Sequence, residues 1–208
     1  ALHLSVHART GLVTFHSPHP MDGPGHPEGF TELTQRTYWR CLLAEEYDAS
    51  SDAPWQIPLT EDETSHIVTR QPGKARGRLT GGNLALICSV LGTPYEIDTE
   101  NNILLIEDIG EQPYRVDRLL SQLKLAGKLD SLSGVIVGQF TECEPEDGKP
   151  SLSLHEIFGE YLDELDVPIV EEFPTGHARD NATLPLGVEV ELDADAKTVT
   201  VLQNPVQL

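Results

Sequence analysis

Apolar and polar positions along the chain predict short buried strands separated by helices. Residues 102–107 and 134–140 are almost continuously apolar, which is typical of strands buried on both faces. Between them, apolar residues recur at helical spacing over 113–126, behind a proline that suits the first turn of a helix. Two alternating segments, 187–192 and 197–202, predict an antiparallel hairpin. Strands alternating with helices, followed by a hairpin, predict an α/β fold with a mixed sheet.

The same patterns predict further elements along the rest of the chain. Helices are expected at residues 31–47, 84–91 and 154–165, and strands at residues 12–15, 55–59, 66–70 and 168–170. Thr31 is a suitable N-cap for the first of these helices. Trp39, Leu42 and Leu43 are expected on its apolar side. Residues 16–29 hold four prolines and three glycines and are expected to form a loop or linker.

The composition excludes two classes of partner. The formal net charge is −20, from 34 acidic and 14 basic residues. Such a chain repels nucleic acid and anionic membranes, since binding to phosphate needs clustered Lys and Arg. A strongly acidic, lysine-poor composition is also typical of salt-adapted proteins. No apolar run approaches the roughly 20 residues of a membrane-spanning helix.

Three widely spaced cysteines, Cys41, Cys88 and Cys143, predict neither a disulfide framework nor a metal site. A reducing, cytoplasmic location is therefore expected.

Two loops carry residues suited to acid–base chemistry. Glu107 ends a predicted buried strand, at the edge of the sheet where α/β proteins build their sites. His177 follows Gly176 in a polar loop after a later strand. If the loops meet, the carboxylate would fix the imidazole tautomer and stabilise its charged form. The plainer alternatives are that Glu107 and Asp108 cap the following loop, and that His177 is an exposed loop histidine.

A third candidate is the turn Gly81, Gly82 and Asn83, which opens a predicted helix. Backbone N–H groups there could bind an anion such as a substrate carboxylate. The alternative is that the glycines serve only a tight turn from strand to helix. The chain contains neither GxxxxGK[ST] nor GxGxxG, so the turn is not a phosphate loop.

A zinc site is the fourth candidate, from His16, His19, His26 and Glu28. Four prolines stiffen this stretch, and no helix presents two histidines four residues apart. We therefore interpret these histidines as solvent-exposed loop residues and predict no metal.

No nucleophile accompanies the acid–base pair. No serine lies in a GxSxG turn, and no cysteine lies at a strand-to-helix turn among basic residues.

A set of motifs nevertheless resembles one family in order and spacing. They are Thr-Gly-Leu-Val-Thr-Phe-His at 10–16, Gly-Gly-Asn-Leu-Ala at 81–85, Leu-Gly-Thr-Pro-Tyr at 91–95, Leu-Ile-Glu-Asp-Ile-Gly-Glu at 105–111, Tyr-Arg-Val-Asp-Arg-Leu-Leu at 114–120, Gly-His at 176–177 and Leu-Pro-Leu-Gly at 184–187. The chain thereby resembles the LD-carboxypeptidases and the microcin C self-immunity peptidases. The resemblance covers essentially the whole chain.

The resemblance implies a Ser-Glu-His triad, with Glu107 and His177 as two of its members. The serine and the oxyanion hole are expected in a first domain, with the serine just ahead of Ala1. Residues 1–29 are then the remnant and linker of that Rossmann-like or flavodoxin-like domain. Residues 30–208 form the second, mixed-sheet domain. No cofactor or metal is implied.

The implied activity is that of a serine-type carboxypeptidase that cleaves an amide next to a free carboxylate. The substrate would be a murein tetrapeptide or a peptidyl nucleotide. The expected partners are that substrate, the first domain and, as a further candidate, a second copy of the chain. The isolated chain is expected to be inactive. The alternative is a non-catalytic peptide-binding or partner-binding domain that lost its nucleophile.

Overall fold

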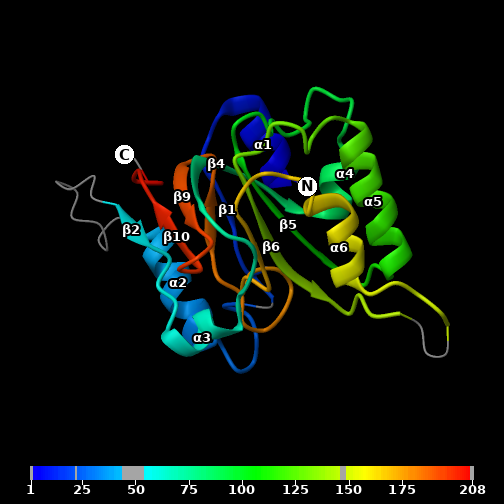
Figure 1. Ribbon diagram of the computed structural model, residues 1–208. Helices are drawn as coiled ribbons and strands as arrows, with labels where there is room; N and C mark the ends of the chain where they lie inside the picture. Colours follow the sequence, from blue (N-terminus) through cyan, green and yellow to red (C-terminus); the bar gives the residue numbers. More distant parts are fainter. Residues whose placement is uncertain (1, 22, 44–53, 146–148, 207–208) are drawn as a thin grey trace.

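A curved eight-stranded sheet forms the centre of the molecule (Figure 1). The computed structural model describes residues 2–21, 23–43, 54–145 and 149–206. The central strands β4 (Lys74–Asn83), β5 (Ile103–Ile109), β6 (Gly134–Thr141) and β7 (Ile169–Glu171) are parallel. On one side β9 (Glu189–Asp193) pairs antiparallel with β4, followed by β10 (Thr198–Val201) and β2 (Trp55–Gln56), each antiparallel to the strand before it. On the other side β3 (Val68–Gln71) pairs antiparallel with β7. The predicted α/β class with a mixed sheet is therefore confirmed.

The remaining elements pack around this sheet. β1 (Thr14–His16) and β8 (Leu184–Leu186) form a separate antiparallel pair. The helices are α1 (Leu2–Thr10), α2 (Glu32–Leu42), α3 (Glu61–His66), α4 (Leu84–Ser89), α5 (Pro113–Leu125) and α6 (Leu154–Leu162). Figure 1 shows α4, α5 and α6 on one side of β5 and β6, with α2 and α3 beside β2 and β10.

Strand β5 is buried on both faces, as its continuous apolar run predicts. Leu104 and Ile106 belong to the core under α4, α5 and α6. Ile103 and Leu105 point the other way, into the core shared with β8, β9 and β10. Burial of each such side chain contributes about 2 kcal/mol. The end of β5 is therefore held rigidly from both sides.

The sheet curls strongly, so that its edge strand β3 approaches β9. Thr69 of β3 donates a side-chain hydrogen bond to the carbonyl oxygen of Ala194 at 2.6 Å. The amide of Ala194 in turn donates to the carbonyl oxygen of Gly73 at 2.9 Å. This curl gives the sheet a partly barrel-like form and encloses the core on its inner face.

Several sequence predictions of local structure need correction. In α2, Trp39 and Leu43 are 40% and 38% exposed, whereas Leu33, Thr37 and Cys41 are buried. The buried residues recur every four positions and define the inner face of α2, so Trp39 lies on the opposite face, where it packs edge-on against Tyr38. The end of the predicted helix, residues 44–47, lies outside the described residues.

Helix α3 and strand β8 had no counterpart in the sequence prediction. Helix α3 occupies residues next to the expected strand 66–70 and begins at a capping box between Thr60 and Glu63. Strand β8 was also missed, because three residues containing a proline carry little periodic signal. The expected hairpin is confirmed as β9 and β10, with Thr198 opposite Asp193.

The predicted division at residue 29 stays a prediction. Strand β1, from the first segment, pairs with β8, from the second, so the two segments are in contact.

A matched pair of substitutions tests the close approach of β4 and β5. Gly81 has φ +113°, and a Cβ there would lie 2.1 Å from the carbonyl oxygen of Leu105. Gly92 has φ +75° but no heavy atom within 4 Å of such a Cβ. Gly81→Ala should therefore lower the free energy of unfolding by roughly 3 kcal/mol or more. Gly92→Ala should lower it by about 1 kcal/mol. Equal losses of unfolding free energy in the two variants, measured by urea unfolding, would contradict the close approach of β4 and β5.

Candidate active site

Strand β5 ends in two buried carboxylates that point to opposite faces. Glu107 has 0% exposure and shares its face with Ile103 and Leu105, whereas Asp108 follows Leu104 and Ile106 toward α4. The register between β5 and β6 shifts between Ile106 and Asp108, which marks a bulge at this point. The pleat of the strand thus separates the two acidic side chains into different environments.

The loop after β7 brings His177 to Glu107. The Nδ1 atom of His177 lies 2.7 Å from Oε2 of Glu107, a hydrogen bond between imidazole and carboxylate. His177 has a side-chain exposure of 41%, so its ring reaches from the buried carboxylate toward solvent. A proton on Nδ1 leaves Nε2 as the basic nitrogen, directed away from Glu107.

Hydrogen bonds within the loop fix the position of His177. The Asn181 side chain accepts from the amide of Gly176 at 3.2 Å and donates to its carbonyl oxygen at 2.5 Å. Gly176 has φ +144°, and a Cβ there would lie 3.1 Å from Oε2 of Glu107. Only glycine permits this backbone conformation and this close approach. The residue before the histidine is thus part of the site's construction.

Asp108 fixes the adjacent turn and is not available for acid–base chemistry. Its Oδ1 atom accepts from the Asn83 side chain at 2.7 Å and from the amide of Ile109 at 2.9 Å. Its Oδ2 atom accepts from the amide of Ala85 at 2.9 Å. These bonds tie the start of α4 to the end of β5. Asp108 therefore has an architectural role beside Glu107.

His16 is a site residue that sequence reasoning missed. It was expected to be exposed to solvent, but it is 8% exposed, at the end of β1. Its Nε2 atom lies 3.8 Å from Oε1 of Glu107, the oxygen that His177 does not use. The short apolar stretch before His16 was the sequence signal for its burial, because side chains of a strand alternate between the two faces and the last one can point inward.

Burial keeps two histidines of this cluster neutral. Desolvation, followed by the proximity of His3 and His177, lowers the pKa of His16 to about 3. Desolvation lowers the pKa of His3 to about 4, and the two rings lie 5.9 Å apart. The other loop histidines differ, because the rings of His19 and His26 accept from backbone amides two residues further on.

A cavity of about 280 Å³ opens beside the Glu107–His177 pair. The polar side chains that line it are His3, His16, Ser17, His19, Asn83, Glu107, His177, Arg179 and Asn181. Phe15, Pro18 and Leu86 supply apolar walls. A small polar ligand with an apolar part fits such a lining.

Residues 81–83, predicted as a turn, form the end of strand β4, with Asn83 as the N-cap of α4, and contribute to the site only in part. Asn83 lines the cavity, whereas Gly81 lies in the wall of a different one. The amide of Ala85 is bound by Asp108, and the amide of Leu86 by the side chain of Asn83. Two of the amides that might have held a substrate anion are thus already engaged. A direct contact from Asn83 to substrate stays a prediction.

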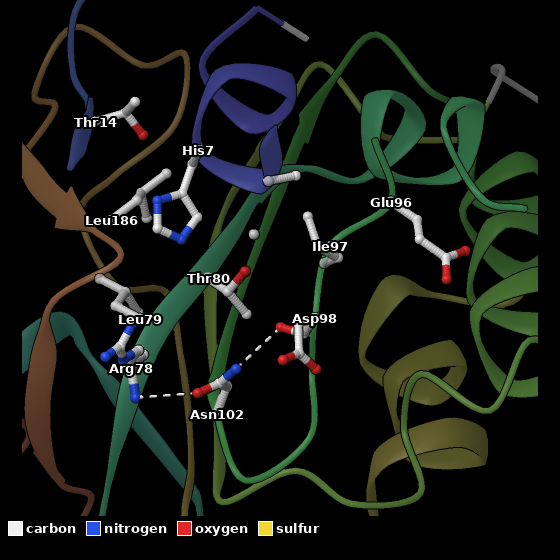
Figure 2. Close-up of a pocket in the computed structure, with 12 residues that line it drawn as sticks. His7, Thr14, Arg78, Leu79, Thr80, Glu96, Ile97, Asp98, Asn102 and Leu186 are labelled. Carbon is white, nitrogen blue, oxygen red and sulfur yellow. Dashed lines mark hydrogen bonds between the residues drawn. The ribbon is translucent and has the colours of Figure 1, made fainter. Parts of the chain in front are cut away.

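A second cavity, of about 180 Å³, lies between α1, β4 and the loop around Asp98 (Figure 2). Figure 2 shows His7 beside Leu186, with Asn102 joined to Asp98 and to the backbone of Arg78. Neither Glu107 nor His177 lines this cavity; both line the cavity of about 280 Å³.

No cluster within the described ranges has three or more His, Cys, Asp or Glu side chains arranged to hold a metal ion. All three cysteines are free and buried. Burial raises the pKa of Cys41 and Cys88 to about 12 and that of Cys143 to about 11. They stay protonated at neutral pH and are unsuited to nucleophilic attack. Among the residues described, no helix is long and apolar enough to cross a membrane.

Comparison with known proteins gives the class to which this fold and site belong. The family model of the LD-carboxypeptidase C-terminal domain matches residues 76–192 of the chain. The chain therefore belongs to the LD-carboxypeptidase family, as its motifs predicted.

Individual relatives agree with this assignment. A probable murein peptide carboxypeptidase of Bacillus subtilis is 38% identical over 204 residues, which cover 96% of this chain and 59% of the relative. The solved structure of the microcin C7 self-immunity protein MccF from Escherichia coli superposes with a TM-score of 0.84 and is 26% identical in sequence. The match covers 99% of this chain and 65% of the MccF chain. The structure of muramoyltetrapeptide carboxypeptidase from Oxalobacter formigenes superposes with a TM-score of 0.77 at 25% sequence identity. That match covers 96% of this chain and 63% of the carboxypeptidase.

The chain spans about three-fifths of the length of the Bacillus subtilis relative. MccF has also been solved as an active-site mutant in which a serine, an asparagine and a lysine are replaced by alanine. Another of its structures holds aspartyl sulfamoyl adenosine.

The depressed pKa of His16 predicts a measurable loss of stability in acid. The unfolded chain binds a proton at His16 below about pH 6.5, whereas the folded chain resists protonation down to about pH 3. The stability contributed by neutral His16 is therefore complete above pH 6.5 and falls as the pH decreases toward 3. The slope is about 1.4 kcal/mol per pH unit for one proton.

Urea unfolding between pH 7 and pH 4 should show a shallower acid slope in His16→Phe than in the unmodified chain. His19→Phe, at an exposed ring, is the matched control and should leave the slope unchanged. Parallel slopes for His16→Phe and the unmodified chain would contradict the buried, neutral imidazole.

Proposed function

We propose that the full-length protein is a serine-type carboxypeptidase that cleaves an amide bond next to a free carboxylate. His177 acts as the general base, and Glu107 orients it. The observation that carries the proposal is the 2.7 Å contact between Nδ1 of His177 and Oε2 of Glu107. A fully buried carboxylate behind a half-exposed imidazole is the arrangement that activates a hydroxyl nucleophile in triad hydrolases.

In this mechanism Nε2 of His177 accepts the proton of a serine hydroxyl as that oxygen attacks the substrate carbonyl. The resulting imidazolium is stabilised by the negative charge of Glu107. His177 then gives the proton to the leaving amine, and water releases the acyl group by the same steps. Every proton movement passes through one nitrogen, which is why its orientation matters.

We propose that the serine belongs to a part of the full-length protein that the 208 residues do not include. The serine of the MccF active-site mutant supports a serine mechanism in this family. Ser17 lines the cavity with His177 and is the in-chain serine that must be tested against this proposal. By the same reasoning, the 208-residue polypeptide alone should hydrolyse nothing measurably.

Two substrate classes are in keeping with the relatives. Murein peptides are named for the Bacillus subtilis protein, and an aminoacyl nucleotide analogue is bound by MccF. Both place an amide or an amide-like link near a carboxylate. Arg179 and Asn83, in the cavity wall, are the groups best suited to hold that carboxylate. We further propose that the protein acts in the cytoplasm, where its three free cysteines would remain reduced.

Substitution of the pair tests the mechanism in the full-length protein. Glu107→Gln removes the negative charge and should lower kcat by roughly 10³–10⁴-fold. His177→Ala removes the base and should lower kcat at least as much. Circular dichroism should show both variants folded.

The controls repeat the same chemical changes away from the cavity. Glu100→Gln lies before the opposite end of β5, and His66→Ala lies at the exposed end of α3. Both should keep near-normal turnover, and so should Ser17→Ala. Near-normal turnover in Glu107→Gln, or loss of turnover in Ser17→Ala as complete as that in His177→Ala, would contradict the assigned roles.

Peptide hydrolysis assays test the substrate class. The full-length protein should cleave peptides with a free C-terminal carboxylate and should leave those with an amidated C-terminus intact, because the carboxylate supplies binding energy near the reacting bond. Comparison of L,D- and L,L-peptides then separates a murein peptidase from a general one. Equal rates on free and amidated peptides would exclude carboxypeptidase activity.

A further inference from the structure

We propose that His16 is a positioning residue, whose neutral imidazole donates from Nε2 to Oε1 of Glu107 and so holds the carboxylate that orients His177. The inference rests on the proposed function for its catalytic consequence. Its structural part can be tested without turnover.

The first observation is an unsatisfied pair of polar atoms. Oε2 of Glu107 is bound by His177, but Oε1 is buried and has no hydrogen-bond partner within the described part of the chain. Nε2 of His16 is likewise buried and without such a partner there, and it faces Oε1 at 3.8 Å. Buried polar groups of native proteins are almost always hydrogen-bonded. Nε2 of His16, as donor, and Oε1 of Glu107, as acceptor, can therefore satisfy each other.

The second observation is that little movement is needed. A normal contact of this type measures about 2.9 Å, so the two atoms need to approach by about 0.9 Å. A small rotation of either side chain is enough. His16 is held at the end of β1 by its pairing with Leu184 of β8, so the ring is presented to Glu107 from a fixed backbone.

The third observation is that the backbone leaves room for this ring. A Cβ at Gly82 would lie 3.2 Å from Nε2 of His3 and 3.5 Å from Nδ1 of His16. Gly82 also has φ +137°, so a side chain there would be strained as well as crowded. Glycine at this position thus permits two imidazoles to pack behind the carboxylate.

The cluster favours a neutral His16. The titratable side chains that line the cavity are His3, His16, His19, Glu107, His177 and Arg179. His177 must become positively charged during the reaction, and a second imidazolium on the same carboxylate would oppose that step. A neutral N–H donor fixes the geometry of Glu107 and leaves its charge to stabilise His177.

A donor to Glu107 also affects how the pair titrates. The hydrogen bond stabilises the carboxylate most when His177 is neutral, because an imidazolium already compensates the charge. Loss of the donor therefore favours the protonated form of the pair, and its apparent pKa rises. A residue that only fills space would not have this effect.

The test in the full-length protein compares three variants. His16→Phe, which removes the donor, should move the acidic limb of kcat/KM upward by roughly one pH unit and lower kcat at pH 6 about tenfold. KM should stay within about twofold, because His16 acts through Glu107 and not on substrate. His16→Gln, which retains an amide donor, should restore most of the loss. His66→Phe, at the exposed end of α3 and away from the cavity, should change neither the limb nor kcat.

Nuclear magnetic resonance of the imidazole rings separates failure of this inference from failure of the proposed function. The pKa of His177 in the folded 208-residue chain should be higher in His16→Phe than in the unmodified chain, whether or not any peptide is hydrolysed. An unchanged His177 titration and an unchanged pH profile would overturn the inference. If His16→Phe does not fold, the tautomer of His16 in the unmodified chain decides: a proton on Nε2 supports the contact, and a proton on Nδ1 alone overturns it.

Discussion

The burial of one negative charge at the end of β5 is the constraint on which the site depends. Glu107 has no exposure to solvent, and an ionised carboxylate in such a place is costly unless other groups compensate it. His177 supplies one hydrogen bond, and His16 faces the second oxygen. The glycines at 82 and 176 let backbone and rings come close enough to do so. The same enclosure that makes the charge costly makes it effective in orienting an imidazole.

The pleat of β5 points two adjacent acidic side chains to opposite faces of the sheet. Glu107 points toward the cavity, and Asp108 points toward α4, where it binds three donors. This division explains why the end of β4 looks like an anion site in the sequence, whereas the amides of Ala85 and Leu86 that follow it are already hydrogen-bonded in the structure. The end of β4 places Asn83 in the cavity wall, beside Glu107 and His177.

Sequence reasoning predicted the parts of the fold that have strong periodicity. The buried strands β5 and β6, the helix α5 and the closing hairpin all follow from apolar spacing, and the meeting of Glu107 with His177 follows from two loops at one sheet edge. It missed α3 and β8, which are too short to show a period. It also predicted His16 to be exposed, whereas the residue is buried. The burial of this proline-rich segment depends on the pairing of β1 with β8, which is far away in the sequence.

The tautomer of His177 tests the central claim most directly. Nitrogen-15 magnetic resonance of the unmodified folded chain at neutral pH can tell which ring nitrogen carries the proton. The account predicts a proton on Nδ1, protected from exchange by its bond to Glu107, and a basic, unprotonated Nε2. A proton on Nε2, or an Nδ1 proton that exchanges as freely as in an exposed histidine, would contradict it.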